Sequence, residues 1–367
     1  MSLKTKIFTV GTMRTGGSLV SNMLSVHSQI MIFPVVVHFF RFIYHQYDPL
    51  TPENVERLLH HLRIRLKYRM NITIQPDLIF EAIMKRGISY AVCYDETMKY
   101  LVNITDKQIW GEYVTLQWRD VPAFLKMFQD GKVIHIYRDL RGILKSFGKL
   151  SFMPDHLYLN CIFNWIDSIN HIKKYEEEIP RDRYMSIKFE DVHNNPEKEA
   201  NRLCSFLNVP FEKAMIEGDK WPSLLNTKYV NAGMSVYTKK NVYGFDPERS
   251  KTWRNTIMDW ELTLAEFLAH KQLEAAGYEC VLTSYDAKVL RNGLNKLLKQ
   301  DFLRSKFVHY FETGEGCSES PLDPTEPKNW GATEDGFSRF IETPTYQKYE
   351  NELNEMESDL ALKYASK

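Results

Sequence analysis

The sequence predicts an α/β protein whose mostly parallel central sheet is flanked by helices. Short apolar runs of strand length alternate with longer segments of helical period, which is typical of the crossover units of a parallel sheet. A glycine-bearing turn joins the first apolar run to a helical segment. The chain has 367 residues, of which 44% are hydrophobic, so it is long and apolar enough to bury a large core.

The elements follow one another in chain order. Apolar, β-branched runs predict three strands, at residues 7–10, 133–137 and 184–189. Apolar residues at helical spacing predict helices that begin at Ser18, near Pro52 and near Asp155, and further helices over 196–207 and 260–276. Thr51 precedes Pro52 and is a residue type that caps helices. The other face of this helix is basic, and we expect it to be solvated, with contact to an anion as the alternative.

The composition changes after about residue 281, which predicts a domain over 1–280 and a C-terminal helical extension over 281–367. Residues 286–311 have a helical pattern rich in Lys and Arg, whereas residues 312–336 contain seven acidic residues and one Lys. We expect helices, an acidic and proline-containing loop, and a terminal helix from about Pro344. The basic helix either lies on a membrane surface, pairs with the acidic loop or is solvated.

Charge and cysteine usage limit the function classes. Lys and Arg total 47 and so do Asp and Glu, and this balance argues against a polycation that binds nucleic acid. Five widely spaced cysteines, without a Cys/His cluster, predict reduced thiols and neither a disulfide framework nor a metal site. No signal sequence and no segment long enough to span a membrane are evident, so we expect a cytoplasmic protein.

The turn after the first strand predicts an anion site. Residues 11–18 read Gly-Thr-Met-Arg-Thr-Gly-Gly-Ser, and the backbone N–H groups of such a turn point into one concavity at a helix N-terminus. The spacing from Gly11 to Gly16 matches a Walker A loop, but Gly17 stands where the Lys would be and the cation is Arg14 instead. A P-loop phosphotransferase is therefore the less favoured alternative.

A second anion site is predicted further along the chain. Arg138 follows a buried strand and Ser146 lies eight residues later in the next helix. In an open α/β sheet, ligands sit at the carboxyl ends of the strands. Arg138 and Ser146 are therefore placed to hold a second phosphate near the first.

Together these motifs resemble those of the sulfotransferases that use 3′-phosphoadenosine 5′-phosphosulfate (PAPS). The resemblance spans residue 6 to about residue 280. It rests on the following residues: Gly11, Arg14, Thr15, Gly16, Gly17, Ser18 and His27 in the first motif; Arg138, Asp139, Arg141 and Ser146 in the second; and the blocks at 189–191, 204–211 and 249–255.

This resemblance implies a P-loop-like sulfotransferase fold and PAPS as cosubstrate, without a metal. It implies that the backbone amides of residues 15–18, with the Thr15 and Ser18 hydroxyls, hold the 5′-phosphosulfate, and that Arg14 neutralises the leaving group. Arg138 and Ser146 are implied to bind the 3′-phosphate, helped by Arg249 or Lys251. Phe189 falls where the family often has an adenine-contacting Tyr.

The acceptor side departs from the family pattern. Gly17 replaces the usual Thr, and a Glu that is common around residues 34–36 is missing. The candidates for a general base are His38, which could equally be a core histidine, and Glu112. The expected function is sulfuryl transfer to a hydroxyl or amine of a small molecule or lipid, with a catalytically degenerate PAP-binding protein as the alternative. The aromatic segment 33–47 fits a hydrophobic acceptor pocket or an ordinary core.

Overall fold

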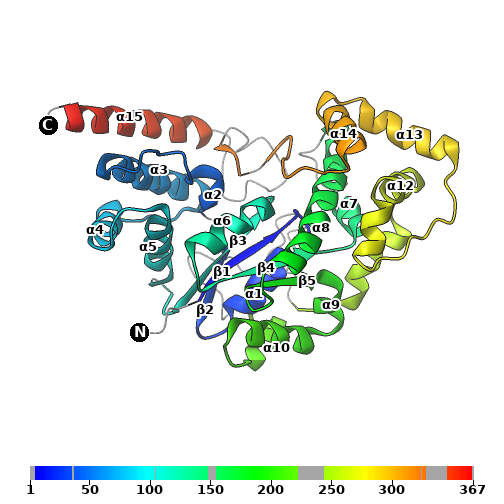
Figure 1. The fold of residues 1–367 in the computed structure, drawn as a ribbon, viewed down its shortest axis with the longest axis horizontal. Helices are drawn as coiled ribbons and strands as arrows, with labels where there is room; N and C mark the ends of the chain where they lie inside the picture. The colour runs from blue at the N-terminus through cyan, green and yellow to red at the C-terminus, as the bar shows by residue number, and fades with distance from the viewer. Residues whose placement is uncertain are drawn as a thin grey trace.

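The protein is an α/β structure built on one five-stranded parallel sheet with the strand order β2-β3-β1-β4-β5. The structure is a computed structural model and describes residues 5–34, 37–103, 105–147, 154–221, 244–323, 325–327 and 345–365. Helices lie on both sides of the sheet (Figure 1). The predicted α/β class and the parallel sheet are confirmed.

The strands are buried along most of their length. They are β1 (Lys6–Gly11), β2 (Ile30–Pro34), β3 (Ile109–Thr115), β4 (Gly131–Tyr137) and β5 (Tyr184–Lys188). The three predicted strands correspond to β1, β4 and β5, but β5 ends one residue early because Phe189 begins a helix. β3 was not predicted, since Gly111 and Glu112 interrupt its apolar pattern although both are buried.

Helices α1 to α8 connect these strands, whereas α9, α10 and α12 follow β5. They are α1 (Gly17–Ser25), α2 (Phe39–Phe42), α3 (Pro52–Met70), α4 (Pro76–Arg86), α5 (Tyr90–Asn103), α6 (Val121–Met127), α7 (Leu140–Phe147), α8 (Asn160–Glu178), α9 (Phe189–Asn194), α10 (Pro196–Leu207) and α12 (Asp259–Ala275). The predicted N-cap of α3 is confirmed, because Thr51 Oγ1 accepts the N–H of Asn54 at 3.2 Å.

The C-terminal extension continues with α13 (Ala287–Leu298), α14 (Asp301–Thr313) and α15 (Thr345–Ala365). The basic stretch is therefore two helices, separated at residues 299–300. Figure 1 shows α15 alongside α3, and ion pairs such as Arg63–Glu352 join the two helices. The expectation that the basic face of α3 is solvated is thus wrong. The division into domains at residue 280 stays a prediction.

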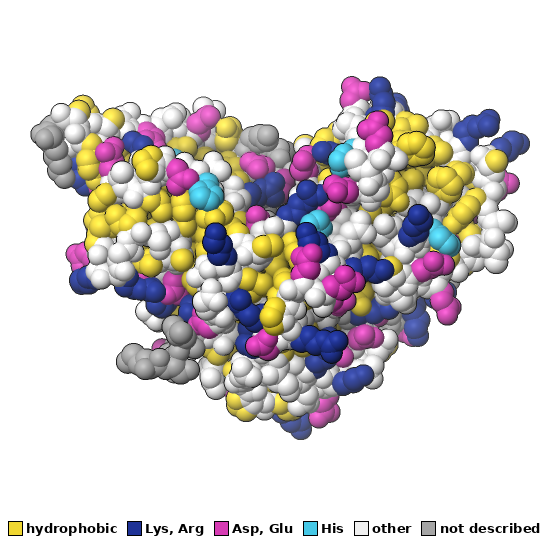
Figure 2. Space-filling view, in the orientation of Figure 1, with side chains coloured by type: hydrophobic (Ala, Val, Ile, Leu, Met, Phe, Trp, Pro, Cys, Tyr) yellow, Lys and Arg dark blue, Asp and Glu magenta, His cyan; other side chains and the backbone are white. Residues whose placement is uncertain are grey.

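All five cysteines are free thiols. In the part of the chain that the structure describes, no helix is both long and apolar enough to cross a lipid bilayer. Figure 2 shows a notch in the surface between the part formed by α3 and α15 and the part formed by α13 and α14, with charged side chains along it.

Candidate active site

The turn between β1 and α1 has the backbone of an anion-binding loop. Arg14 and Gly16 have φ angles of 71° and 91°, so the chain turns through left-handed conformations before α1 begins. No side chain caps the N-terminus of α1, and Thr15 Oγ1 donates instead to the carbonyl of Thr12 at 2.8 Å. The first amides of α1 are therefore available to an anion.

Two aromatic rings press against the glycines of this loop. A Cβ on Gly16 would lie 2.2 Å from Cδ2 of Phe189, and a Cβ on Gly17 would lie 1.9 Å from Cζ of Tyr113. Neither position therefore accepts a side chain without movement of a ring. The replacement of the family's usual Thr by Gly17 is explained by Tyr113, a contact that sequence reasoning missed because the two residues lie on different elements.

Arg138 lies at the carboxyl end of β4, beside the loop. Its guanidinium is 4.2 Å from the centroid of the Phe189 ring, Nη1 donates to the Arg14 carbonyl at 3.3 Å and Nη2 donates to the Arg249 carbonyl at 3.4 Å. Among the described residues, its buried Nε has no hydrogen-bond partner. Burial lowers the pKa of Arg138. This is a partly buried cation with donors left for an anion.

The two predicted anion motifs meet in space. Arg14 Nε donates to Ser146 Oγ at 2.7 Å, and Arg138 reaches the backbone of the same Arg14. The loop and the β4–α7 junction therefore form one positively charged region at the carboxyl edge of the sheet. The motifs come together because β1 and β4 are neighbouring parallel strands, with Gly11 opposite Ile136.

Asp139 and Arg141 of the second motif form contacts around the turn that carries Arg138. The Asp139 N–H donates to Glu190 Oε1 at 3.1 Å, and the Tyr278 hydroxyl donates to Glu190 Oε2 at 2.9 Å. Arg141 is buried, pairs with Asp139 and Glu266, and lies 4.2 Å from the centroid of the Trp253 ring. These contacts fix the turn that carries Arg138.

The two candidates for extra 3′-phosphate contacts lie in different surroundings. Arg249, in the 3₁₀ helix η5 (Pro247–Ser250), places its carbonyl against Arg138, and its positive charge acts on His193 together with that of Arg138. Burial and these two charges lower the pKa of His193 to about 4. Lys251 is more exposed and pairs with Glu248 at 3.1 Å. Arg249 is therefore the better placed of the two.

Glu112 and His38, the two candidates for a general base, are both fully buried. Glu112 Oε1 accepts the N–H groups of Val37 and His38 at 2.7 and 2.6 Å, and Oε2 accepts the Tyr94 hydroxyl at 2.7 Å. Burial raises the pKa of Glu112. Oε1 thus holds Val37 and His38 before α2 in place, and Oε2 connects them to Tyr94 of α5.

His38 lies at the same edge of the sheet as the anion-binding loop. It has a φ of 52°, and its Nδ1 is 2.8 Å from Nε2 of Gln117. Gln117 comes two residues after Thr115, which is the register partner of Gly11 at the start of the loop. His38 is therefore held near the loop, on the side opposite Arg138.

The aromatic residues that follow His38 pack in the core. Phe39 stacks on Tyr94 with ring centroids 4.2 Å apart, and Phe40 packs edge-on against Phe8 at 5.5 Å. Phe39 and Phe40 are both buried. These two residues therefore belong to the core, which favours the core reading for this part of segment 33–47. Residues 35 and 36 lie outside the described part of the chain. The described residues contain no group of His, Cys, Asp or Glu side chains arranged to hold a metal ion.

Comparisons with known proteins agree with this geometry. A sequence model of the sulfotransferase family matches residues 6–213. The sulfotransferase domain from the curacin biosynthetic pathway has 15% identity and a TM-score of 0.51 over 76% of this chain and 99% of that one, which shows a shared fold. The sulfotransferase domain of the Synechococcus PCC 7002 olefin synthase has 18% identity and a TM-score of 0.49, over 76% and 98% of the two chains. A mouse sulfotransferase in complex with PAP has 10% identity and a TM-score of 0.40, over 76% and 90%. No curated protein gives a significant match.

Proposed function

The chain belongs to the sulfotransferase family, and we propose that it transfers the sulfuryl group of PAPS to a hydroxyl or amine of an acceptor. The observation that carries this proposal is the meeting of Arg14, Ser146 and Arg138 at one edge of the sheet. A nucleotide with an anionic group at each end requires two such sites close together, one for each group.

The residues present fit this donor. The amides of residues 15–18, with the hydroxyls of Thr15 and Ser18, would hold the 5′-phosphosulfate at the N-terminus of α1. The unsatisfied Nε of Arg138, with Ser146 and Arg249, would hold the 3′-phosphate. The Phe189 ring would pack on the adenine, and we propose no nucleotide contact for the surface residue Lys251 beyond long-range attraction.

The chemistry needs positioning and charge stabilisation. In the transfer step, the acceptor oxygen or nitrogen forms a bond to sulfur while the bond between sulfur and the 5′-phosphate oxygen breaks. Arg14 and the loop amides stabilise the negative charge that grows on the departing phosphate. We propose that His38 takes the acceptor proton. Glu112 acts through His38, because it holds the His38 backbone.

Calorimetric titration with PAP tests the donor site. Wild-type protein should bind PAP, and Arg138→Ala should weaken binding about 100-fold, because hydrogen bonds to a charged group are lost. Lys251→Ala, directly after the 3₁₀ helix that contains Arg249, is the matched control and should change the affinity for PAP less than about threefold. Absence of PAP binding, or equal affinity in the Arg138 variant, would refute the proposal.

A catalytically degenerate PAP-binding protein is the second candidate. The observation that favours it is the complete burial of both His38 and Glu112. Radiolabelled PAPS, offered with a panel of phenols, alkyl alcohols and amines, separates the two functions. Tight PAP binding without transfer to any compound, together with unchanged PAPS hydrolysis in His38→Ala, would favour the degenerate protein.

A further inference from the structure

The C-terminal extension returns to the acceptor side of the site. Residues 315–323 and 325–327, here named the C-terminal strap, leave α14 and run toward α2 (Figure 1). The family match ends at residue 213, so the strap lies outside it. Its first half is seated on α8: the Cys317 N–H donates to the Phe163 carbonyl at 3.2 Å, and Asn164 Nδ2 donates to the Cys317 carbonyl at 2.8 Å.

The fit on α8 is close. Asn160 Nδ2 donates to the Glu319 carbonyl at 2.7 Å, and a Cβ on Gly316 would lie only 2.0 Å from the Phe163 carbonyl oxygen. Backbone packed this tightly, with its carbonyls bound by two buried Asn side chains, has a fixed path. The strap is therefore positioned before it reaches α2.

Near α2 the strap carries a buried carboxylate, that of Asp323, which pairs with Arg41. Asp323 is 2% exposed and forms an ion pair with Arg41, and Glu326 lies 3.4 Å from the same guanidinium. Asp323 Oδ1 also accepts the N–H and the hydroxyl of Thr325, at 2.7 and 2.6 Å. Oδ1 holds the turn at Thr325, and Oδ2 faces Arg41. A substitution can therefore change the contact with Arg41 and keep the contact with Thr325.

A second cation ties the same elements together. Arg65 is buried in α3, its Nη2 donates to the Thr325 carbonyl at 3.0 Å, and its guanidinium lies 3.6 Å from the centroid of the Phe42 ring in α2. The strap, α3 and α2 therefore meet around two arginines, Arg41 and Arg65.

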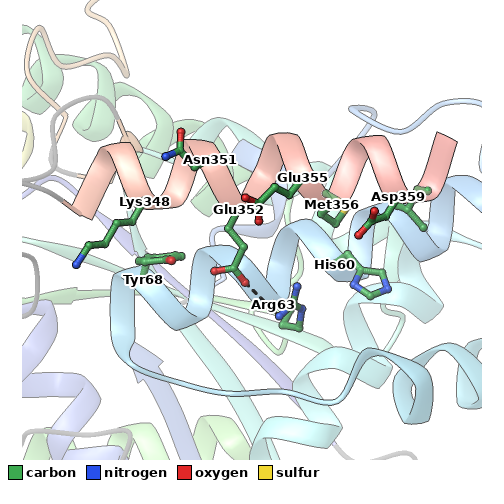
Figure 3. Close-up of a pocket in the computed structure, with 10 residues that line it drawn as sticks. His60, Arg63, Tyr68, Lys348, Asn351, Glu352, Glu355, Met356 and Asp359 are labelled. Atoms are coloured by element: carbon green, nitrogen blue, oxygen red, sulfur yellow. Dashed lines mark hydrogen bonds and ion pairs between the residues drawn. The ribbon is translucent and has the colours of Figure 1, made fainter. Parts of the chain in front are cut away.

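The far end of the extension is also anchored. In Figure 3, Glu352 on α15 points toward Arg63 on α3, 3.3 Å away, and Glu352 also pairs with Lys67 at 2.5 Å. Ile64 of α3 packs with Met356 and Leu360 of α15 in a small separate cluster. The first half of the strap is thus held on α8, and α15, which follows the strap in the chain, is held on α3.

These contacts act on α2, which begins directly after His38. The Arg41 N–H donates to the His38 carbonyl at 3.0 Å, so Arg41 and His38 belong to the same turn. We propose that the C-terminal strap braces α2 and that the Arg41–Asp323 pair thereby positions His38, in addition to the hydrogen bond from the His38 N–H to Glu112. This inference rests on the proposed function for the role of His38, whereas the coupling of the strap to α2 does not.

The test uses the full chain with Asp323→Asn, Arg41→Gln and the double variant. Asn keeps the acceptor for Thr325 and replaces the charged oxygen that faces Arg41 with an uncharged NH2 group. Glu319→Gln, which removes the exposed partner of Lys306 on the same strap, is the matched control. The first measurement is hydrogen–deuterium exchange of the peptide that covers residues 37–44, and the second is the ¹⁵N resonance of the His38 ring, assigned with His38→Gln.

We expect exchange in residues 37–44 to become about tenfold faster in Asp323→Asn and in Arg41→Gln. The double variant should show the same rate as the single variants, because the two residues act as a pair. The chemical shift of the His38 ring nitrogens should change in these variants. In Arg41→Lys, which keeps the positive charge, it should stay at the wild-type value. Glu319→Gln should leave exchange and resonance unchanged. A globally destabilised variant is recognised by faster exchange in β1 and β4 as well.

Unchanged exchange and an unmoved His38 resonance in both single variants would overturn the inference. An equal effect in Glu319→Gln would also overturn it, because any change in the strap would then suffice. PAP calorimetry on the same proteins keeps the two proposals distinguishable. Affinity for PAP should stay within about twofold of wild type, since Arg41 and Asp323 belong to α2 and the strap and not to the β1–α1 loop or the β4–α7 junction. Failure of the wild type to bind PAP would refute the donor site and leave the coupling of strap and α2 standing.

Discussion

The Arg14 guanidinium donates a hydrogen bond of 2.7 Å to the hydroxyl of Ser146, which lies 132 residues further along the chain. This contact joins the loop after β1 to the helix after β4. It also places the group expected to stabilise the 5′ end of the donor beside a group expected to bind its 3′ end. If the proposed function is right, a connected set of side chains recognises the two ends of one nucleotide.

Removal of the Ser146 hydroxyl should weaken PAP binding about tenfold, which corresponds to the loss of one hydrogen bond to a charged group. Ser146→Ala tests this by calorimetry, and Ser146→Thr, which keeps the hydroxyl, should bind more tightly than Ser146→Ala. Ser186→Ala on β5, whose hydroxyl donates to Glu176 instead, is the control. Equal affinities in Ser146→Ala and wild type would contradict a role for this residue.

The loop glycine and its aromatic neighbour should behave as a coupled pair. Gly17→Thr alone brings a Cβ within 1.9 Å of the Tyr113 ring and should abolish PAP binding and lower the midpoint of thermal unfolding. Gly17→Thr combined with Tyr113→Ala should recover binding, because the space is then free and a hydroxyl is gained. A double variant as defective as Gly17→Thr would show that the ring is not the obstacle.

PAP should raise the pKa of His193. In the protein alone, burial and the charges of Arg249 and Arg138 lower this pKa to about 4. A bound 3′-phosphate offsets both positive charges, so the protonated imidazole becomes less unfavourable and its pKa should rise by about one unit. By linkage, PAP affinity should rise as the pH falls from about 5 toward 4. Histidine NMR titration with and without PAP measures the shift, and His193→Asn should remove the associated proton uptake.

Glu112 is expected to stabilise the fold of the acceptor side. Glu112→Gln replaces a buried carboxylate that accepts two backbone N–H groups and a hydroxyl, and should lower the free energy of unfolding by about 3 kcal/mol. Urea denaturation measures this loss. Tyr94→Phe, which removes one of the three donors, should cost about 1 kcal/mol. A fully stable Glu112→Gln protein that had lost transfer activity would instead indicate a general base.

Asp120 should give the protein a stability that falls with rising pH. Burial raises the pKa of this carboxyl from 3.8 to about 6, although the Arg41 charge opposes the change. Between these two values the folded protein holds a proton that the unfolded chain has released, so folding becomes less favourable as the pH rises through this window. Asp120→Asn should therefore stabilise the protein at pH 7 by up to ~3 kcal/mol and have little effect at pH 3. A destabilised Asp120→Asn protein at pH 7 would contradict this assignment.

Much of the fold was predictable because local patterns carried it. Residues adjacent in the sequence form the apolar runs of β1, β4 and β5. Adjacent residues also form the Thr51–Pro52 start of α3. The same is true of the anion loop, because its glycines and Arg14 lie within one turn of chain. A parallel sheet then brings the loop after β1 and the residue after β4 to the same edge.

The sequence by itself therefore determined the parallel class of the sheet and three of its five strands, the two anion motifs and the family, since each depends on residues close in the chain or on strand direction. Only the tertiary structure decided why Gly17 cannot be Thr, why the basic face of α3 is covered, and what holds α2. Tyr113, Glu352 and Asp323 make these contacts from distant parts of the chain. Contacts of this kind depend on which elements pack together. The local sequence of a residue does not show which distant residue will contact it.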